Sequence, residues 1–167
     1  MAESPVSKSQ VSRGEPLISV VIPSYNAEQH IERCLQSVIR QKIDAEYEVI
    51  VVDSSRDETP TIIQSKFPGV RLIRREQQTY PGAARNLGAQ AAKAGILAFI
   101  DSDCIAADNW LALGLQSMQE GYKIVGGSVR NANPESWISV ADYILTFNEF
   151  MPGMPSRTMQ GMPSCNL

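Results

Sequence analysis

Hydrophobic residues follow two alternating patterns along this chain. Short, continuous apolar runs typical of buried strands are followed by stretches in which apolar residues recur every three or four positions. The first run, Leu17–Ile22, is rich in β-branched residues, and we expect Pro23 to end it. The segment Ile31–Ile39 then has the spacing of an amphipathic helix, with Asn26 as its expected N-cap. The chain therefore opens with a predicted strand and helix.

The same alternation of strand and helix continues through residue 129. Further strands are predicted over Tyr47–Val52, Val70–Ile73, Ile96–Ile100 and Lys123–Val129. Helices are predicted from Thr59, over Gly82–Ala94 and from a cap at Asp108 to Met118. Such alternation implies right-handed crossovers and a parallel sheet covered on both faces. In sheets of this kind ligands bind at the carboxyl ends of the strands.

The two ends of the chain have different patterns. Residues 1–15 are rich in Ser, Glu, Lys and Gln without an apolar core, and we expect them to form a disordered lead-in to a domain over residues 16–167. Ser136–Phe150 has helical spacing, whereas Met151–Pro163 is rich in Pro, Met and Gly and predicts an irregular loop. The structured part is therefore expected to be one domain.

Composition narrows the classes of function. A length of 167 residues with 43% hydrophobic and 20% charged residues is typical of one globular domain. A net charge of −3 gives no basic surface for nucleic acid, and no apolar run approaches the roughly 20 residues that span a bilayer. Cys34, Cys104 and Cys165 are odd in number and widely spaced, so we expect reduced thiols, and His30 is not expected to be catalytic. An anionic ligand must then be held by local groups or a metal.

Carboxylates stand where the predicted architecture places ligands. Asp53 follows the second strand, and Asp101 and Asp103 follow the fourth. Two carboxylates spaced in this way in a loop can bind one Mg²⁺ or Mn²⁺, whose remaining ligands are phosphate oxygens and water. Such a cation would neutralise a diphosphate leaving group. The structural alternative is that Asp101 or Asp103 only caps the turn after the strand.

Four ordered segments carry a resemblance to a known family. They are Val20–Asn26 (VVIPSYN), Val49–Ser55 (VIVVDSS), Gly82–Gly88 (GAARNLG) and Phe99–Asp103 (FIDSD). Their order and spacing resemble the signatures of family 2 glycosyltransferases over roughly Pro16 to Leu167. The resemblance implies an α/β, Rossmann-like fold of the A type of glycosyltransferase, with a mostly parallel central sheet and helices on both faces. It also implies an inverting transfer from a nucleoside-diphosphate sugar, with a UDP-sugar favoured.

The resemblance assigns roles position by position. The donor-binding residues it implies are Pro23, Ser24, Tyr25, Asn26, Asp53, Arg85, Asp101 and Ser102. Among them, Asp53 would accept a hydrogen bond from the nucleotide base, and Arg85 would contact the nucleotide or its diphosphate. Asp101 would face the ribose and the sugar, and Asp103 would be the principal ligand of Mn²⁺ or Mg²⁺, together with Asp101. These assignments are expectations about this chain.

Two departures from the family pattern affect the expected chemistry. Ser54 stands where the family often has a second Asp or Asn, so the hydrogen bonding beneath the nucleotide is expected to differ. In addition, no carboxylate is nominated as the base that takes the acceptor proton, because Asp142 and Glu149 are interpreted as the solvated side of a helix. Met162–Leu167 resembles a family segment that precedes the base, which is therefore expected beyond Leu167. A chain incomplete at this end is expected to bind the donor without efficient transfer.

Other functions remain open at this point. The segment Phe99–Ile105 also resembles the phosphatase motif of the haloacid dehalogenase group, with Asp101 as nucleophile and Asp103 as general acid, although that motif normally follows the first strand. A dinucleotide-binding oxidoreductase would need a Gly-x-Gly-x-x-Gly motif after the first strand, and this chain has no such motif there. A module that binds nucleotide sugars without catalysis is the third alternative. The family resemblance further suggests a sugar or lipid-linked acceptor and a cytoplasmic location, peripheral to the membrane.

Overall fold

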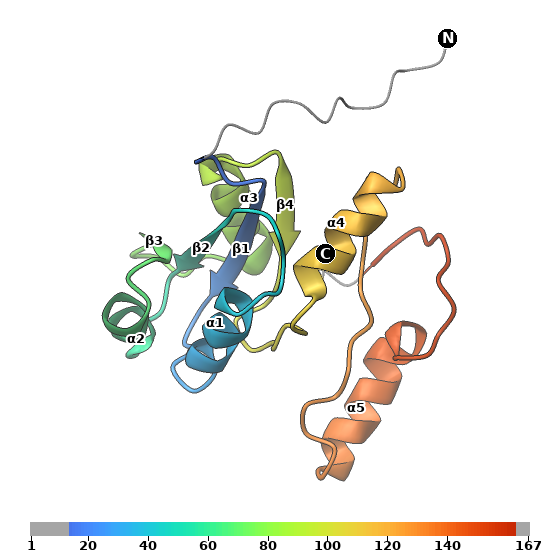
Figure 1. Ribbon diagram of the computed structural model, residues 1–167. Coiled ribbons are helices and arrows are strands. Elements are labelled where there is room, and N and C mark those ends of the chain that lie inside the picture. The colour runs from blue at the N-terminus through green and yellow to red at the C-terminus, as the bar shows by residue number, and fades with distance from the viewer. Residues whose placement is uncertain (1–13, 163–167) are drawn as a thin grey trace.

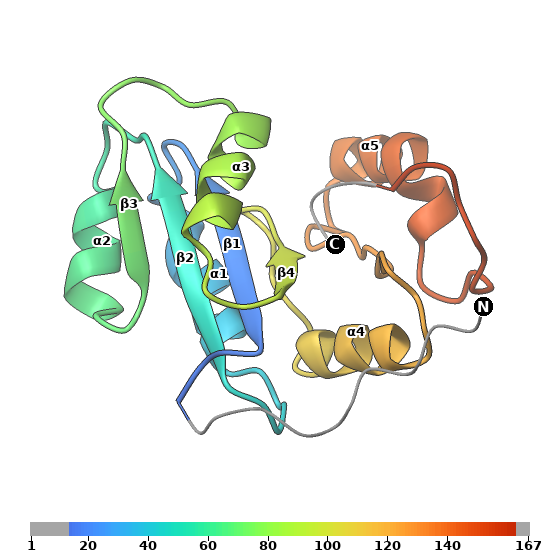
Figure 2. The same ribbon diagram turned by 90° about the horizontal axis from the view of Figure 1, so that it is seen from above.

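Four parallel strands form the sheet of the computed structural model, which describes residues 14–162. In chain order they are β1 (Ile18–Ser24), β2 (Tyr47–Asp53), β3 (Arg71–Arg74) and β4 (Ile96–Phe99). Their order in the sheet is β3-β2-β1-β4, so the chain builds outward from β1 on one side and then crosses to its other side (Figure 2). A topological switch point therefore lies between the carboxyl ends of β1 and β4. Sheets of this class bind ligands at such a point.

Strand β1 continues through Pro23, so the expectation that this proline ends the strand is wrong. The carbonyl of Val21 accepts from Ile100 N at 3.4 Å on the β4 side, and the carbonyl of Ser24 accepts from Ser54 N at 3.1 Å on the β2 side. Because backbone groups alternate along a strand, the nitrogen of Pro23 points toward β4. The pairing with β4 ends at Val21–Phe99, so the proline removes no hydrogen bond from the ladder.

Helices cover both faces of the sheet, as the sequence predicts. Helices α1 (Ile31–Ile39) and α2 (Thr59–Lys66) lie on one face, and α3 (Pro81–Ala91) lies on the other (Figures 1 and 2). The apolar side of α1 packs in the larger core cluster with β1 and β2, whereas Ala84 of α3 packs with the opposite face of β2. Strands β1 and β2 are thus buried between two helical layers, which explains their nearly continuous apolar sequences.

Helix α3 approaches β1 very closely. A Cβ atom added to Gly88 would overlap the side chain of Val21, so this position in the helix requires glycine. The absence of a side chain at Gly88 therefore lets this helix lie close to the sheet. The close approach also fixes the position of Arg85, one turn earlier in the same helix.

Helix α4 (Trp110–Gln119) lies beside β4 and is fastened through a buried glutamine. Gln41 donates from Nε2 to Ala107 O at 2.7 Å and accepts from Leu111 N at 2.9 Å. The predicted cap, Asp108, is not the N-cap of the helix. It forms an exposed ion pair with Lys42 at 2.6 Å instead, and Asn109 is the residue before the first turn.

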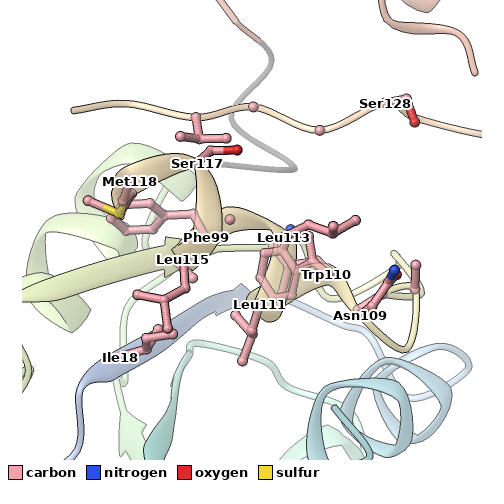
Figure 3. Close-up of a pocket in the computed structure, with 18 of the residues that line it drawn as sticks. Ile18, Phe99, Asn109, Trp110, Leu111, Leu113, Leu115, Ser117, Met118 and Ser128 are labelled. Atoms are coloured by element: carbon pink, nitrogen blue, oxygen red, sulfur yellow. The ribbon is translucent and has the colours of Figure 1, made fainter. Parts of the chain in front are cut away.

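The predicted fifth strand, Lys123–Val129, is not formed, and this prediction is wrong. The segment lines one side of a largely apolar cavity of about 950 Å³. Strand β4 and helix α4 line the other side (Figure 3). Ile124 is 71% exposed, and no described strand pairs with the segment. Apolar residues with a pair of glycines satisfy the sequence pattern of a strand, but a strand also requires a hydrogen-bonded neighbour.

Helix α5 (Trp137–Phe147) and the short 3₁₀ helix η1 (Asn148–Phe150) confirm the helix predicted over Ser136–Phe150. In both views α5 lies beyond the β4 edge of the sheet (Figures 1 and 2). It is joined to the preceding segment by a hydrogen bond of 2.7 Å from Tyr143 Oη to Val129 O, and none of its residues is buried. Residues 151–162 are irregular, as expected.

Several sequence predictions concern residues outside this description. The expected lead-in falls almost wholly within residues 1–13, and Cys165 falls within residues 163–167. Among residues 14–162, no helix combines the length and apolar character needed to cross a membrane.

Candidate functional site

The residues predicted to bind the donor lie at the ends of β1 and β2, in the loops after β1 and β4, and in α3. Ser24 is paired in register with Asp53, and Asp53 is paired with Arg74 of β3. On the other side of β1, Val21 is paired with Phe99, two residues before Asp101. Parallel strands end at the same edge, so the tertiary structure brings Asp53 and Asp101 to one edge on either side of β1.

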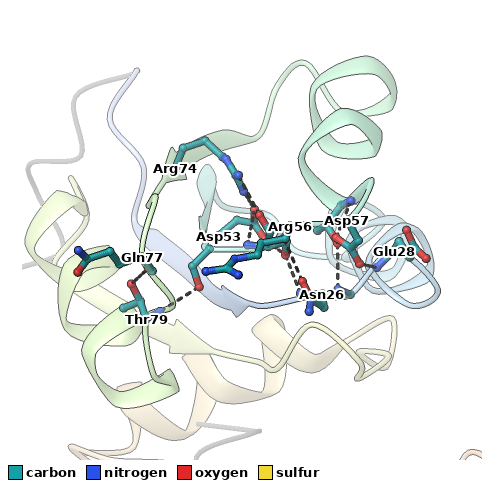
Figure 4. Close-up of polar contacts among 12 residues, drawn as sticks. Asn26, Glu28, Asp53, Arg56, Asp57, Arg74, Gln77 and Thr79 are labelled. Carbon is teal, nitrogen blue, oxygen red and sulfur yellow. Dashed lines mark hydrogen bonds and ion pairs between the residues drawn. The ribbon is translucent and has the colours of Figure 1, made fainter.

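Asp53 is buried at this edge and bonded to neighbouring polar groups. Its carboxylate is fully buried and forms an ion pair with Arg74. Ser55 donates to the same carboxylate from its hydroxyl and, at 3.3 Å, from its backbone nitrogen (Figure 4). Arg74 also donates from Nη2 to Ser55 O at 3.0 Å. The oxygens expected to meet a nucleotide base are thus already bonded within the chain.

Arg74 is a residue that the sequence reasoning missed. It ends β3 directly beside the end of β2, so its position depends on the register between the two strands. The sequence contains one usable signal, a cationic residue as the last residue of a strand on the edge where an acid ends the preceding strand. That signal acquires meaning only once the two strands are known to be neighbours.

The loop after β1 is locked against the loop after β2. Asn26 adopts a φ of 49°, donates from its backbone nitrogen to Ser55 Oγ at 2.7 Å and accepts from Arg56 N at 3.0 Å through Oδ1. Asparagine tolerates this left-handed conformation better than most residues. Asn26 is therefore not the N-cap of α1, whose N-cap is His30, and the sequence prediction is wrong on this point.

The other predicted residues at the end of β1 and directly after it differ in exposure. Pro23 and Ser24 are buried, whereas Tyr25 is 40% exposed at the edge. The hydroxyl of Ser24 is buried and has no hydrogen-bond partner among residues 14–162. A ligand that offered a polar atom here would satisfy a group that the described chain leaves unpaired.

Asp57 fixes the start of α2 beneath the loop. It accepts from Thr59 N at 3.0 Å, from Thr59 Oγ1 at 2.6 Å and from Glu28 N at 3.2 Å. Burial acts to raise the pKa of Asp57, but the hydrogen bonds from Thr59 and Glu28 outweigh it and lower the pKa below its ordinary value. This acid therefore has a structural role at the edge, where it joins the start of α2 to the loop after β1.

The Asp101–Ser102–Asp103 turn is the more open part of the site. Asp101 Oδ1 pairs with Nη2 of Arg85, and the two side chains are 33% and 15% exposed. The buried Nε of Arg85 has no hydrogen-bond partner within the described chain. Asp103 is exposed to solvent, and Ser102 is half-buried. Arg85, expected to contact the nucleotide or diphosphate, is thus positioned by Asp101 in this structure.

A buried thiol supports the turn from below. Cys34 of α1 donates from Sγ to Asp101 O at 3.5 Å. Burial, with smaller contributions from the charges of Asp103 and Asp101, raises the pKa of Cys34 to about 12. The thiol therefore stays protonated at neutral pH, as expected for a structural cysteine.

The acidic residues at this turn suit a metal that arrives with its ligand. Residues 14–162 contain no cluster of three or more His, Cys, Asp or Glu side chains that could hold a metal ion. Asp101 and Asp103 alone supply hard oxygen ligands but leave most of a coordination shell to other groups. Mg²⁺ commonly binds in this way, through one or two carboxylates together with phosphates and water. The residues present therefore fit the cation predicted from the sequence.

The carboxylates later in the chain lie outside these loops. Glu149 pairs with Arg157 at 3.4 Å, and Glu120 accepts from Gln116 at 3.2 Å within the last turn of α4. Glu135 and Asp142 are exposed before and within α5. The described contacts therefore give no reason to assign one of them as the catalytic base.

Comparison with known proteins identifies the family. The family model for glycosyl transferase family 2 matches residues 19–161. The chain belongs to this family. Its sheet of four parallel strands with helices on both faces is the A-type glycosyltransferase fold predicted from the sequence.

Relatives extend the family assignment. Glycosyltransferase AglE of Haloferax volcanii is 34% identical over 134 residues, which are 77% of this chain and 44% of AglE. A structure of S. aureus TarS in complex with UDP-GlcNAc is 30% identical with a TM-score of 0.57, over 62% of this chain and 31% of TarS residues 1–349. Mannosyltransferase PcManGT from Pyrobaculum calidifontis, in complex with GDP-Man and Mn²⁺, is 26% identical with a TM-score of 0.57, over 71% of this chain and 36% of the relative. The chain thus spans less than half the length of each.

Proposed function

We propose that this chain is the donor-binding part of a glycosyltransferase that uses a nucleoside-diphosphate sugar and a divalent cation. The observation that carries the proposal is the position of Asp101–Ser102–Asp103 at the switch point of the sheet, in a chain of this family. Related structures hold UDP, UDP-GlcNAc or GDP-Man, and one of them holds Mn²⁺, which supports this class of ligand. A UDP-sugar is the favoured donor.

The metal would be held by Asp103 and Asp101. When bound, Mn²⁺ or Mg²⁺ supplies positive charge that neutralises the diphosphate leaving group. Asp103 suits the principal role because it is exposed, whereas Asp101 already shares one oxygen with Arg85. Arg85 supplies a fixed cation beside the same carboxylate, and its unpaired Nε–H can donate to a phosphate or ribose oxygen.

The loop after β1 would form the adjoining wall of the donor pocket. Tyr25 is exposed at the edge, Ser24 offers an unpaired hydroxyl, and Asn26 is held by the loop after β2. These residues are ordered by contacts within the chain before any ligand binds. A preorganised pocket of this kind loses less conformational entropy on binding.

Calorimetric titration with UDP-, GDP- and dTDP-sugars, each with and without Mn²⁺, tests the proposal. We expect at least one donor to bind more tightly with Mn²⁺, and Asp103→Ala to weaken that binding about tenfold or more, since a principal ligand matters at least as much as its supporting groups. Asp108→Ala is the matched control, because Asp108 is an exposed aspartate paired with Lys42 outside the turn. Donor binding that ignores Mn²⁺, or that survives Asp103→Ala unchanged, would contradict the proposed site.

The same samples separate an enzyme from a binding module. A module without the base would bind the donor with Mn²⁺ and release no nucleoside diphosphate in the presence of sugar or lipid-linked acceptors. The second candidate is favoured by the later carboxylates of the described chain, which are exposed on or near α4 and α5 and, at Glu120 and Glu149, paired with neighbouring side chains. Metal-dependent release of nucleoside diphosphate above the uncatalysed rate would instead support transfer by this chain itself.

A further inference from the structure

The turn that carries the two predicted metal ligands is closed at the carbonyl oxygen of Asp101. Cys104 N donates to this oxygen at 3.0 Å, which makes Asp101–Cys104 a β-turn. Cys34 Sγ of α1 donates to the same oxygen at 3.5 Å. The carboxylate of Asp103 is exposed and accepts from Sγ of its neighbour Cys104 at 3.7 Å. The direction of this carboxylate therefore depends on the backbone of the turn.

Ser37, one helical turn after Cys34 in α1, holds the chain that leaves this β-turn. Its hydroxyl donates to Cys34 O at 2.7 Å and accepts from Ala106 N at 2.9 Å. Because the bond within the helix uses the hydroxyl proton, the oxygen meets the loop as an acceptor. Ala106 is buried, so its N–H needs a partner from the chain.

Gln41, two residues after the end of α1, holds the far end of the same loop. It donates from Nε2 to Ser37 O at 3.1 Å and to Ala107 O at 2.7 Å, and it accepts from Leu111 N at 2.9 Å. With Cys34 and Ser37 it forms a row at the spacing i, i+3 and i+7, which we call the α1 row. Figure 1 shows α1 beside the loop that joins β4 to α4.

The loop between β4 and α4 depends on such support because it has little regular structure. Residues 104–107 are neither helix nor strand. The contacts of the α1 row with the loop and the start of α4 are all made to backbone groups, at Asp101, Ala106, Ala107 and Leu111. The row therefore fixes the path of the main chain, and with it the place from which Asp103 extends.

We propose that the α1 row positions the Asp101–Ser102–Asp103 turn and thereby sets the affinity of this site for a divalent cation. The inference rests on the proposed function, and it assigns no contact between the row and the cation. A cation held by two carboxylates and phosphate oxygens needs these groups in a fixed arrangement. Groups that orient metal ligands commonly contribute about 10- to 100-fold to metal affinity. Cys34, Ser37 and Gln41 are thus positioning residues.

Titration with Mn²⁺ in the presence of excess UDP tests the inference on the whole chain, with GDP as the probe in a parallel series. We expect Ser37→Ala to raise the Mn²⁺ concentration that gives half-maximal nucleotide binding about tenfold, because Ala106 N loses its partner and the turn is no longer fixed. Ser37→Thr keeps the hydroxyl and its bond within the helix. It should stay within about twofold of the unmodified chain.

Ser19→Ala is the matched control at the amino end of β1. Ser19 Oγ donates to Glu48 Oε1 at 2.7 Å and accepts from Ala94 N at 3.1 Å, so it also joins two segments through one donated and one accepted bond. Both alanine variants should lower the urea midpoint, because each leaves a backbone N–H without its partner. Only Ser37→Ala should change the requirement for Mn²⁺. An equal change in both variants would show an effect of stability alone and would overturn the inference.

Variants of Cys34 separate positioning from packing. Cys34 is fully buried, so Cys34→Ala should be more stable than Cys34→Ser, which buries a hydroxyl in an apolar place. The Mn²⁺ requirement should follow the opposite order. Serine keeps a donor for Asp101 O, whereas alanine should raise the half-maximal Mn²⁺ concentration about threefold, the effect of one weak hydrogen bond. The same order for both properties would contradict a positioning role.

The outcomes also distinguish this inference from the proposed function. An unchanged Mn²⁺ requirement in folded Ser37→Ala, with Mn²⁺-dependent binding by the unmodified chain, would overturn the inference and leave the proposed function standing. Binding of UDP and GDP by the unmodified chain that ignores Mn²⁺ would overturn both.

Discussion

The two acidic positions on the carboxyl edge of the sheet are held in opposite ways. Asp53 is fully buried, and both of its oxygens are bonded within the chain. The Asp101–Ser102–Asp103 turn remains accessible, with Asp103 exposed and Asp101 sharing one oxygen with Arg85. Similar sequence motifs therefore produce one closed site and one open site.

The difference arises from the strands that flank each acid. Asp53 ends β2 between β1 and β3, so neighbours on both sides can cover it. Asp101 follows the short β4, which is paired with β1 alone among the described strands. A carboxylate enclosed by neighbouring strands needs a partner inside the chain, whereas one at the open end of the sheet can receive a partner from solution. We therefore expect substitutions at the first site to affect stability and at the second to affect binding.

The largest expected effect is a difference in stability between variants that lack Arg74 and variants that lack Arg85. Arg74→Ala would leave the buried Asp53 charge unpaired, and we expect it to lower the free energy of unfolding by about 3 kcal/mol. Arg85→Ala faces an acid that is 33% exposed and can be hydrated, so about 1 kcal/mol is expected. Urea denaturation of both variants measures the difference, and equal losses would show that burial does not distinguish the two pairs.

An intermediate effect is expected at the contact between α3 and β1. Gly88→Ala would place a methyl group against Val21 and push α3 away from the sheet, at a cost of about 2 kcal/mol. Because α3 carries Arg85, the shift should also disturb the Asp101 pair while the register of β2 with β3 is retained. Thermal unfolding together with donor titration would measure both consequences.

Gly82→Ala is the matched control in the same helix. Apart from the adjacent residues and the backbone of its own helix, no atom lies within 4 Å of a Cβ built there, so alanine should be neutral or should stabilise the helix by up to about 1 kcal/mol. Equal destabilisation by the two substitutions would show that helix propensity, not the contact with Val21, determines the requirement for glycine at position 88.

The smallest expected effect is the loss, at low pH, of the stability that Asp57 contributes in the loop after β2. The folded-state pKa of Asp57 lies below its ordinary value of 3.8, so its contribution to stability is complete above pH 3.8 and is lost as the pH falls through the folded value. Asp57→Asn should therefore lower the urea midpoint at pH 6, and the gap from the unmodified chain should narrow below pH 3.8. A gap that stayed constant down to pH 2 would show that ionisation of Asp57 is not involved.

The segments predicted best are those whose pattern is local. The four paired strands and the helices up to residue 119 follow from apolar periodicity, and the structure reproduces them within a few residues. Lys123–Val129 satisfies the same criterion and forms no strand, because strand formation also depends on a neighbour at hydrogen-bonding distance. Pro23 shows the converse, since its place at the end of the pairing with β4 made it compatible with a strand.

In the candidate site, too, some features follow from local sequence and others depend on the tertiary structure. The sequence by itself determined that acids follow the second and fourth strands and that the family signatures occur in order, since these are properties of neighbouring residues. It could not show the ion pairs of Arg74 with Asp53 and of Arg85 with Asp101. Nor could it show the hydrogen bond from Asn26 N to Ser55 Oγ. Each of these contacts joins residues that are 16 to 29 positions apart in the chain. Only the order and register of the strands brought these groups together. Tertiary structure therefore decided which acid is enclosed and which remains open to a ligand.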